Sequence, residues 1–305
     1  MYAIKTEGLS KKYGERNVVN KVSLEVEKGS VFGFLGKNGA GKSTFINMIT
    51  GLCLPDTGTF SLMSDQTKIG VMPDYSTFYD DLTALDHLAY FSSILKIRPS
   101  KEKMIGLLEK VGLEGAINIK AKNFSFGMKK KLGIAQALIN DPEILFLDEP
   151  TSGVDANSIL SIHRLIKDVS IQGTTVFLTS HSLDEVEKIC DEIAIMDRGT
   201  VKLQGSIEQL KRGFQTSLTV TIKHGGISED SLTEVREKLT SLGGSDIQWG
   251  KSEVNVSLEV EAVIPEINKV FVAFNIDVFR IYVYEPSLEE IFINTGEEVE
   301  HPLLA

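Results

Sequence analysis

The sequence predicts an α/β domain followed by a smaller α+β domain. Through residue 213, short apolar segments that end in polar residues alternate with helix-like segments. The charge balance then changes: residues 1–213 hold 26 basic and 26 acidic side chains, whereas residues 214–305 hold 6 and 16, which accounts for the net charge of −10. We therefore expect two domains, 1–213 and 214–305, each long enough for a core of its own.

The first domain is predicted to be a sheet of short strands with helices between them. Its strands are expected where apolar runs meet turn or polar residues, at 22–29, 31–36, 143–150 and 174–181, with a hairpin over 192–205. A helix is expected over 43–52, and residues 80–140 are predicted to be a mostly helical subdomain inserted between strands. Strands that end in polar loops favour ligand binding at the carboxyl ends of the strands.

The second domain has a different order of expected helices and strands. Its expected order is strand 217–223, helix 229–242, strand 246–249, strand 253–260, helix 263–274 and strand 277–284, with a last helix near 287–294. The first six elements follow the β-α-β-β-α-β order of a ferredoxin-like unit. The acidic balance of this domain argues against nucleic acid as its partner, because phosphate contacts need clustered lysine and arginine.

Composition narrows the class of protein further. Hydrophobic residues make up 42% and charged residues 24% of the chain, as in ordinary globular proteins. The two cysteines, Cys53 and Cys190, fit a reducing compartment without a disulfide framework. No basic-then-apolar segment indicates a signal peptide, and no apolar run approaches the roughly 18 residues of a membrane span. Any membrane role is therefore expected to come through a partner.

The segment GKNGAGKS, Gly36 to Ser43, is the strongest motif and matches G-x-x-x-x-G-K-[ST] in full. An apolar strand precedes it and a helix follows, so backbone N–H groups and a helix N-terminus face phosphate oxygens. Lys42 adds a point charge, and the hydroxyl of Ser43 suits Mg²⁺. The alternative is a glycine-rich turn without a ligand. The expected nucleotide-binding residues here are Gly36, Lys37, Asn38, Gly39, Ala40, Gly41, Lys42, Ser43 and Thr44.

Two further strand ends carry candidate catalytic residues. Asp148 and Glu149 end the apolar strand ILFLDEP. Asp148 is placed to hold Mg²⁺, and Glu149 is placed to orient or deprotonate an attacking water. His181 ends the strand TTVFLTS without a second histidine or a cysteine nearby, which favours a γ-phosphate contact over a metal site. The alternatives are a pair of surface acids and a structural histidine.

The order and spacing of five motifs resemble the ATP-binding subunit of ABC transporters over about residues 2–213. The motifs are the Gly36–Ser43 loop, FSFGM, ILFLDEP, SGVD and His181. The resemblance implies a P-loop NTPase core with β-rich and helical subdomains, which binds ATP and Mg²⁺ and hydrolyses ATP. It also implies that Tyr13 stacks on adenine, as aromatic rings do with bases.

The same resemblance implies a composite site across a dimer. Ser125, Phe126, Gly127 and Met128 match the family's signature segment, which contacts the γ-phosphate held by the opposite subunit. Ser152, Gly153 and Asp155 match the loop that communicates across the dimer. The implied partner is a second copy or a second ABC ATPase. The three lysines that follow the signature, Lys129–Lys131, are expected to be solvated.

Two positions depart from the family's commonest pattern. Phe126 stands where many members have glycine, and the packing of its ring stays open. Asp74 stands where many have glutamine. Aspartate is shorter, and in its ionised form it only accepts hydrogen bonds, which argues against a direct contact with Mg²⁺ or the attacking water. Asp74 is therefore expected to reach the metal through a bridging water.

The end of the chain favours one branch of the family. The segment YEPSLEEIFINTG, Tyr284 to Gly296, and the signature form F-S-x-G-M resemble ATPases that serve drug, antibiotic-peptide or ion exporters. The resemblance implies separately encoded transmembrane permease subunits, which dock on the helical subdomain and on Tyr75–Tyr79 at the cytoplasmic face of the cell membrane. The alternatives are a non-transport ABC ATPase and a sensing or immunity ATPase with a membrane partner.

Overall fold

The computed structural model describes residues 1–64, 68–74, 78–214, 217–284 and 287–290. The chain divides into two compact units, Met1–Ile207 and Glu208–Ala305. The division falls at the first residue of helix α7 (Ile207–Phe214), whereas the charge balance placed it at the end of that helix. The shift in charge therefore marks the change of unit but not the element that begins the second one.

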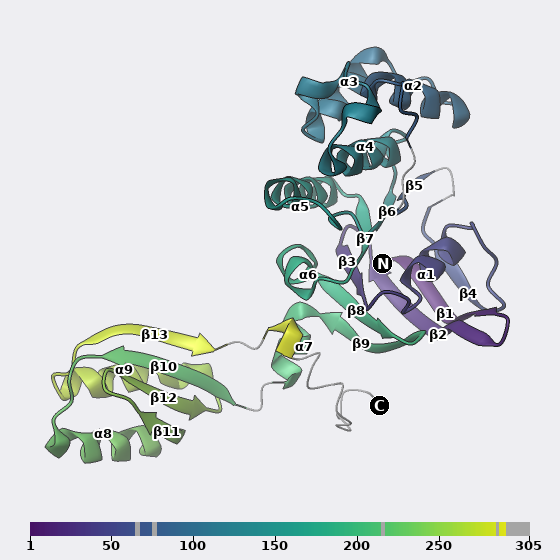
Figure 1. Cartoon of the computed structure of the whole chain (residues 1–305). Coiled ribbons are helices and arrows are strands. Elements are labelled where there is room, and N and C mark those ends of the chain that lie inside the picture. Colours follow the sequence, from purple (N-terminus) through teal and green to yellow (C-terminus); the bar gives the residue numbers. More distant parts are fainter. Residues whose placement is uncertain (65–67, 75–77, 215–216, 285–286, 291–305) are drawn as a thin grey trace. The chain divides into compact units, whose positions relative to one another are not determined.

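A six-stranded sheet in the order β5-β6-β7-β3-β8-β9 forms the centre of the first unit (Figure 1). Its strands are β3 (Val31–Leu35), β5 (Ile69–Met72), β6 (Ile144–Asp148), β7 (Thr175–Ser180), β8 (Glu192–Asp197) and β9 (Thr200–Ser206). Neighbours pair in parallel except β8 and β9, which form the predicted hairpin. Every residue of β3, β6 and β7 is buried, because both faces of the sheet are covered.

Helices and a second sheet cover the two faces of this parallel sheet. Helices α5 (Ala156–Ile171) and α6 (Leu183–Ile189) lie on one face, and α1 (Lys42–Ile49) lies on the other (Figure 1). An antiparallel sheet in the order β2-β1-β4 packs beyond α1. Its strands are β1 (Tyr2–Tyr13), β2 (Arg16–Glu27) and β4 (Thr57–Leu62). The two sheets and α1 share one core, in which the rings of Phe34, Phe45 and Phe177 are packed against one another.

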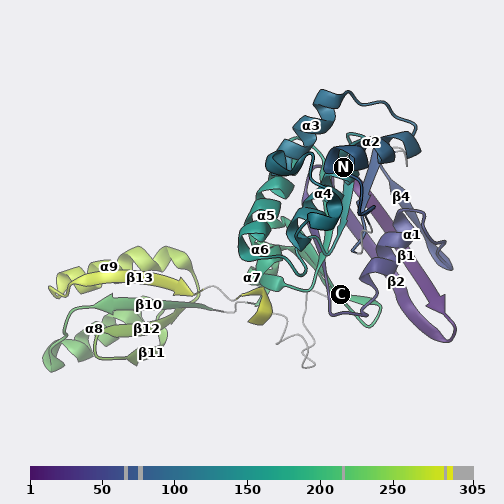
Figure 2. The ribbon, with the colours of Figure 1, turned by 45° about the horizontal axis from the view of Figure 1, so that its top comes forward.

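Three helices gather together (Figure 2), beyond the β5 edge of the parallel sheet (Figure 1). They are α2 (Ala84–Ile94), α3 (Lys101–Lys110) and α4 (Phe126–Leu138), within the predicted helical segment 80–140. Each begins at a hydroxyl side chain that accepts from a backbone N–H of the first turn: Thr83, Ser100 and Ser125. Helix α4 packs against β5 and β6, and Ala137, near its end, lies close to Gly70 of β5.

The second unit contains a four-stranded antiparallel sheet in the order β11-β12-β10-β13. The elements run β10 (Leu218–His224), α8 (Glu229–Ser241), β11 (Ser245–Trp249), β12 (Glu253–Leu258), α9 (Ile264–Ala273) and β13 (Val278–Tyr284). This is the expected β-α-β-β-α-β order, with its own apolar core. Residues 288–290 are helical, while 291–294 of the expected last helix lie outside the described residues.

Candidate active site

The loop between β3 and α1 is built for close backbone approach. Gly41 has a φ of 116°, and a β-carbon there would lie 2.4 Å from the carbonyl oxygen of Val18. Only glycine meets both conditions. Lys37, Asn38, Gly39 and Ser43 are exposed, whereas Gly36, Ala40 and Gly41 are buried. The loop therefore presents its tip and the first turn of α1 to a ligand while its base stays fixed in the core.

Lys42 is buried at the start of α1, with 6% of the residue exposed. Its Nζ donates to the carbonyl oxygen of Gly36 at 2.6 Å and lies 3.2 Å from Oε1 of Glu149. Glu149 comes from the end of β6, so the ion pair joins the two strand ends that the sequence singled out. A buried ammonium group with one carboxylate partner suits a site that receives an anion.

The carboxylate of Glu149 is positioned by two basic side chains. Its Oε2 accepts from Nδ1 of His181 at 2.8 Å, and its Oε1 lies beside Lys42. Oε1 is buried and, apart from its ion pair with Lys42, makes no hydrogen bond within the described part of the chain. Nδ1 of His181 thus contacts the candidate base, and the contact of His181 with a γ-phosphate stays a prediction.

The backbone of Glu149 is strained and supported by a residue that the sequence analysis missed. Glu149 has a φ of 50°, which non-glycine residues adopt uncommonly. Its N–H donates to the hydroxyl oxygen of Thr179 at 3.0 Å, and that hydroxyl donates to Oδ1 of Asp148 at 2.5 Å. Thr179 is fully buried and pairs with Asp148 in the β6–β7 register. It therefore orients both acids.

Asp74 follows β5 and contacts Lys130. The carboxylate oxygen Oδ1 of Asp74 lies 3.1 Å from Nζ of Lys130. Lys130 is 4% exposed, so the expectation that all of Lys129–Lys131 are solvated is wrong for this residue. Helical spacing carried the signal, because Lys130, Ile134 and Leu138 lie four residues apart on the buried face of α4. A magnesium contact by Asp74 stays a prediction.

The signature segment starts α4 beside the loop of residues 152–155. Ser125 accepts from the N–H of Met128 at 3.2 Å and caps the helix. A β-carbon at Gly127 would lie 2.8 Å from Oγ of Ser158, so glycine permits α4 to approach α5 closely. The ring of Phe126 covers Gly153, where a β-carbon would lie 3.1 Å from Cε1 of the ring.

The cross-dimer loop and Tyr13 are accessible. Ser152 is half-buried, and Asp155 is exposed and caps α5 by accepting from the N–H of Ser158 at 3.0 Å. Hydrogen bonds from Ser158 hold the pKa of Asp155 below its usual range. Tyr13 ends β1 with 54% of its surface exposed, so its ring is free to stack on a planar group.

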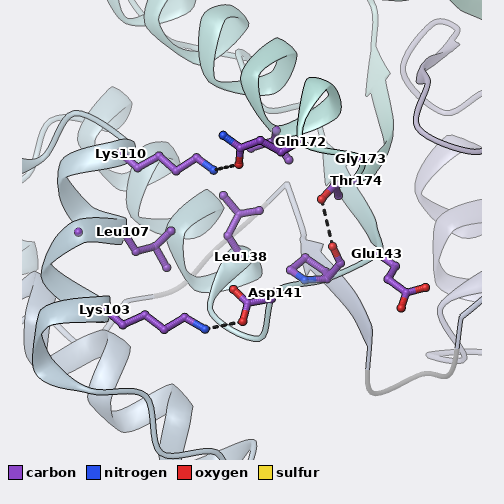
Figure 3. Close-up of a pocket in the computed structure, with 12 residues that line it drawn as sticks. Lys103, Leu107, Lys110, Leu138, Asp141, Glu143, Gln172, Gly173 and Thr174 are labelled. Carbon is purple, nitrogen blue, oxygen red and sulfur yellow. Dashed lines mark hydrogen bonds and ion pairs between the residues drawn. The ribbon is translucent and has the colours of Figure 1, made fainter.

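A surface pocket of about 480 Å³ lies away from these residues, between α3 and the end of α5 (Figure 3). Lys103 pairs with Asp141 at 2.5 Å across it, and Lys110 donates to Gln172 at 2.7 Å. Its lining contains no predicted site residue. The candidate site lies instead where the loop before α1 meets the end of β6, around Lys42 and Glu149.

The loop before α1, buried Lys42 and the acids at the end of β6 define a P-loop nucleotide hydrolase. A protein-family model described as ABC transporter matches residues 19–152. The linearmycin resistance ATP-binding protein LnrL of Bacillus subtilis is 33% identical, and the match covers 95% of this chain and 97% of LnrL. The bacitracin transport ATP-binding protein BcrA of Enterococcus faecalis is also 33% identical, with 95% of both chains covered.

A solved structure supports the same assignment. A dimeric bacterial ABC transporter cassette superposes with a TM-score of 0.61 at 26% identity, covering 67% of this chain and 98% of the cassette. The chain belongs to the family of ABC transporter ATP-binding proteins, and it is an ATPase of that family. In the described part of the chain, no helix is long and apolar enough to cross a membrane.

Proposed function

We propose that this chain powers an exporter of a drug, an antibiotic peptide or an ion through ATP-driven dimerisation. The observation that carries the proposal is the extent of the match to LnrL and BcrA. It covers 95% of this chain in each case, so it extends past the ATPase unit into the second unit. Two proteins named for antibiotic resistance and antibiotic transport are thus similar to this chain over both of its units.

The residues around the phosphate loop fit ATP with Mg²⁺. The loop N–H groups and Lys42 hold the phosphates, Tyr13 stacks on the adenine, and Ser43 and Asp148 supply oxygen ligands for the metal. Bound Mg²⁺ neutralises phosphate charge as it develops. Glu149 accepts the proton of the attacking water through Oε1, which lacks a hydrogen-bond partner among the described residues. His181 keeps the carboxylate in place through Oε2.

The dimer completes this site. The exposed Ser125 and the N–H groups at the start of α4 face a nucleotide held by the opposite subunit. Ser152, Gly153 and Asp155 lie beside that segment and contact the partner. The partner is a second copy or a second ABC ATPase, and one subunit alone hydrolyses ATP poorly. No nucleic acid takes part.

The helical group offers a surface for the membrane subunits. Tyr79 and Tyr90 are 52% and 40% exposed, and their hydroxyl groups lie 3.2 Å apart. Ile94 and Leu95, at the end of α2, are 55% and 50% exposed. Residues 75–77 of the expected docking loop lie outside the described residues. A permease subunit that covers these aromatic and aliphatic groups holds the chain at the cytoplasmic face of the membrane.

Co-purification tests the proposal. An affinity-tagged chain is expressed in its source cell and purified from detergent-solubilised membranes. A multi-helix membrane protein without an ATPase domain is expected in the eluate in fixed proportion. A Tyr79→Ala/Tyr90→Ala variant is expected to lose this protein, while Tyr2→Ala, an exposed tyrosine on β1, retains it. Recovery with ribosomes or DNA, and with no membrane protein, would overturn the proposal.

A further inference from the structure

We propose that Lys130 is a positioning residue for hydrolysis, and that Asp74 is its counter-ion rather than a magnesium ligand. The proposal rests on the proposed role of Glu149 as the base. Lys130 lies in the second turn of α4, the helix that Ser125 caps. It connects the signature helix to Asp74, two residues after β5, and to Glu149, the residue after β6.

The hydrogen bonds of Lys130 are complete. Its ammonium group has three N–H donors, and three oxygens accept from it. The carbonyl oxygen of Glu149 lies at 2.7 Å, and the carbonyl and Oδ1 oxygens of Asp74 both lie at 3.1 Å. The side chain of Lys130 is 5% exposed. A buried cation satisfied in this way is part of the framework of the site and has no donor left for a phosphate.

The bond to Glu149 acts on the strained residue. Glu149 is held at a φ of 50° by Thr179 at its N–H and by Lys130 at its carbonyl oxygen. The direction of the side chain follows from this backbone conformation, so the two bonds together aim the carboxylate toward Lys42. Without the ammonium donor, the left-handed conformation loses a charge-assisted hydrogen bond.

The carboxylate of Asp74 gives Lys130 its counter-charge. A buried lysine without an acid is costly, and removing one partner of a buried pair leaves the other uncompensated. Asp74 is the one acidic side chain that pairs with Lys130 among the described residues. The two side chains therefore act as a unit, which accounts for an aspartate at a position where glutamine is common in the family.

Helix α4 links the position of the signature segment to that of Lys130. Phe126 precedes Lys130 by one helical turn, and Nζ of Lys130 lies 5.8 Å from the centre of its ring. A shift of α4 that moves Ser125 toward a second subunit also moves Lys130, and with it the carbonyl group of Glu149. The pair thus couples formation of the dimer to the orientation of the base.

The test is a double-mutant cycle with Lys130→Gln, Asp74→Gln and the double variant. Lys130→Gln is expected to lower kcat roughly tenfold or more while KM for ATP stays within about twofold, because the base is misaligned but the phosphate loop is intact. Lys130→Arg keeps the charge and is expected to recover part of kcat. Lys129→Gln, on the same turn, is the matched control and is expected to behave as the wild type.

Two measurements that do not depend on turnover complete the test. In urea unfolding of the nucleotide-free protein, each single variant is expected to lower the folding equilibrium constant. The double variant is expected to lower it by roughly tenfold less than the product of the two single-variant fold-changes. For Asp74→Gln, the Mg²⁺ concentration that half-saturates binding of a fluorescent ATP analogue is expected to stay unchanged. Additive effects on folding, or a rise of about tenfold in that concentration, would overturn the proposal.

Glu149→Gln is measured in parallel to separate the two ideas. If Glu149→Gln keeps wild-type turnover, the role of Glu149 as base fails, while the unfolding cycle still decides whether Lys130 and Asp74 form a unit. If Glu149→Gln is inactive and Lys130→Gln keeps wild-type kcat, the positioning role of Lys130 is wrong.

Discussion

Two buried lysines contact Glu149, Lys42 at its carboxylate and Lys130 at its carbonyl oxygen, and they differ in how many hydrogen-bond donors they leave unused. Lys42, in the phosphate loop, donates one hydrogen bond among the described residues and lies beside the carboxylate. Lys130, in α4, uses all three of its donors on carbonyl and carboxylate oxygens. The same side chain thus has unused donors for a ligand in one region, whereas in the other all of its donors bind protein oxygens. The number of unused donors distinguishes the two.

The largest effect is expected from replacing Glu149, the residue that both lysines contact. Glu149→Gln removes the charge beside Lys42 but leaves the backbone bond to Lys130. Turnover is expected to fall by about 100- to 10,000-fold, because proton transfer to the base is lost. Nucleotide binding remains, so ATP is expected to trap a dimer. Steady-state phosphate release and light scattering with size exclusion measure the two effects; unchanged turnover would remove Glu149 as the base.

Replacing Lys42, the lysine that has unused donors, is expected to weaken the binding of ATP. Lys42→Ala removes the point charge of the phosphate loop, and the Kd of a fluorescent ATP analogue is expected to rise by about 100-fold or more. Lys130→Gln in the same assay is expected to bind within about twofold of the wild type. Equal Kd values for Lys42→Ala and the wild type would contradict the phosphate-loop assignment.

The buried His163, which lies beside Glu185, extends the comparison to pH. Burial lowers the pKa of His163 from its ordinary value of 6.5, and Glu185, 3.9 Å away, only partly opposes this shift. The unfolded chain therefore binds a proton first as pH falls below 6.5, so this contribution to stability is lost at acidic pH. His163→Gln is expected to reduce the slope of the unfolding free energy against pH, by no more than the contribution of one bound proton. An unchanged slope would show that His163 does not contribute.

The smallest expected effect belongs to an exposed lysine. The side chains of Lys103 and Asp141 are 43% and 71% exposed. Such surface pairs contribute about 0.2–1 kcal/mol, because water and salt screen them. Lys103→Ala is expected to change the free energy of unfolding by no more than this, and raising the salt concentration is expected to reduce the difference. A larger loss in chemical denaturation would indicate that the pocket in Figure 3 depends on the pair.

Local patterns predicted most of the fold and the main parts of the site. The phosphate loop, the strand ends at Asp148 and His181 and the element order of the second unit each follow from short segments read alone. The β-α-β-β-α-β order was predictable because each element carries its own period and turn residues. The division at Ile207 was not, because the charge balance changes only after α7.

Contacts between distant strands and helices were not predictable in the same way. Thr179 reaches Asp148 through the pairing of two parallel strands, and no local pattern sets which parallel strands are neighbours. Phe126 covers Gly153 only because α4 crosses beside α5. Lys130 was detectable from its spacing with Ile134, but three consecutive lysines resembled a solvated face.

The hydroxyl group of Thr179 has one proton to donate, and this affects hydrogen exchange at the amide of Glu149. That proton goes to Asp148, so the hydroxyl can only accept from the N–H of Glu149. The amide of Glu149 is therefore protected from hydrogen exchange by a side chain of the neighbouring strand β7, not by a backbone carbonyl group. Its exchange rate reports both how often Glu149 leaves this conformation and how often β7 separates from β6.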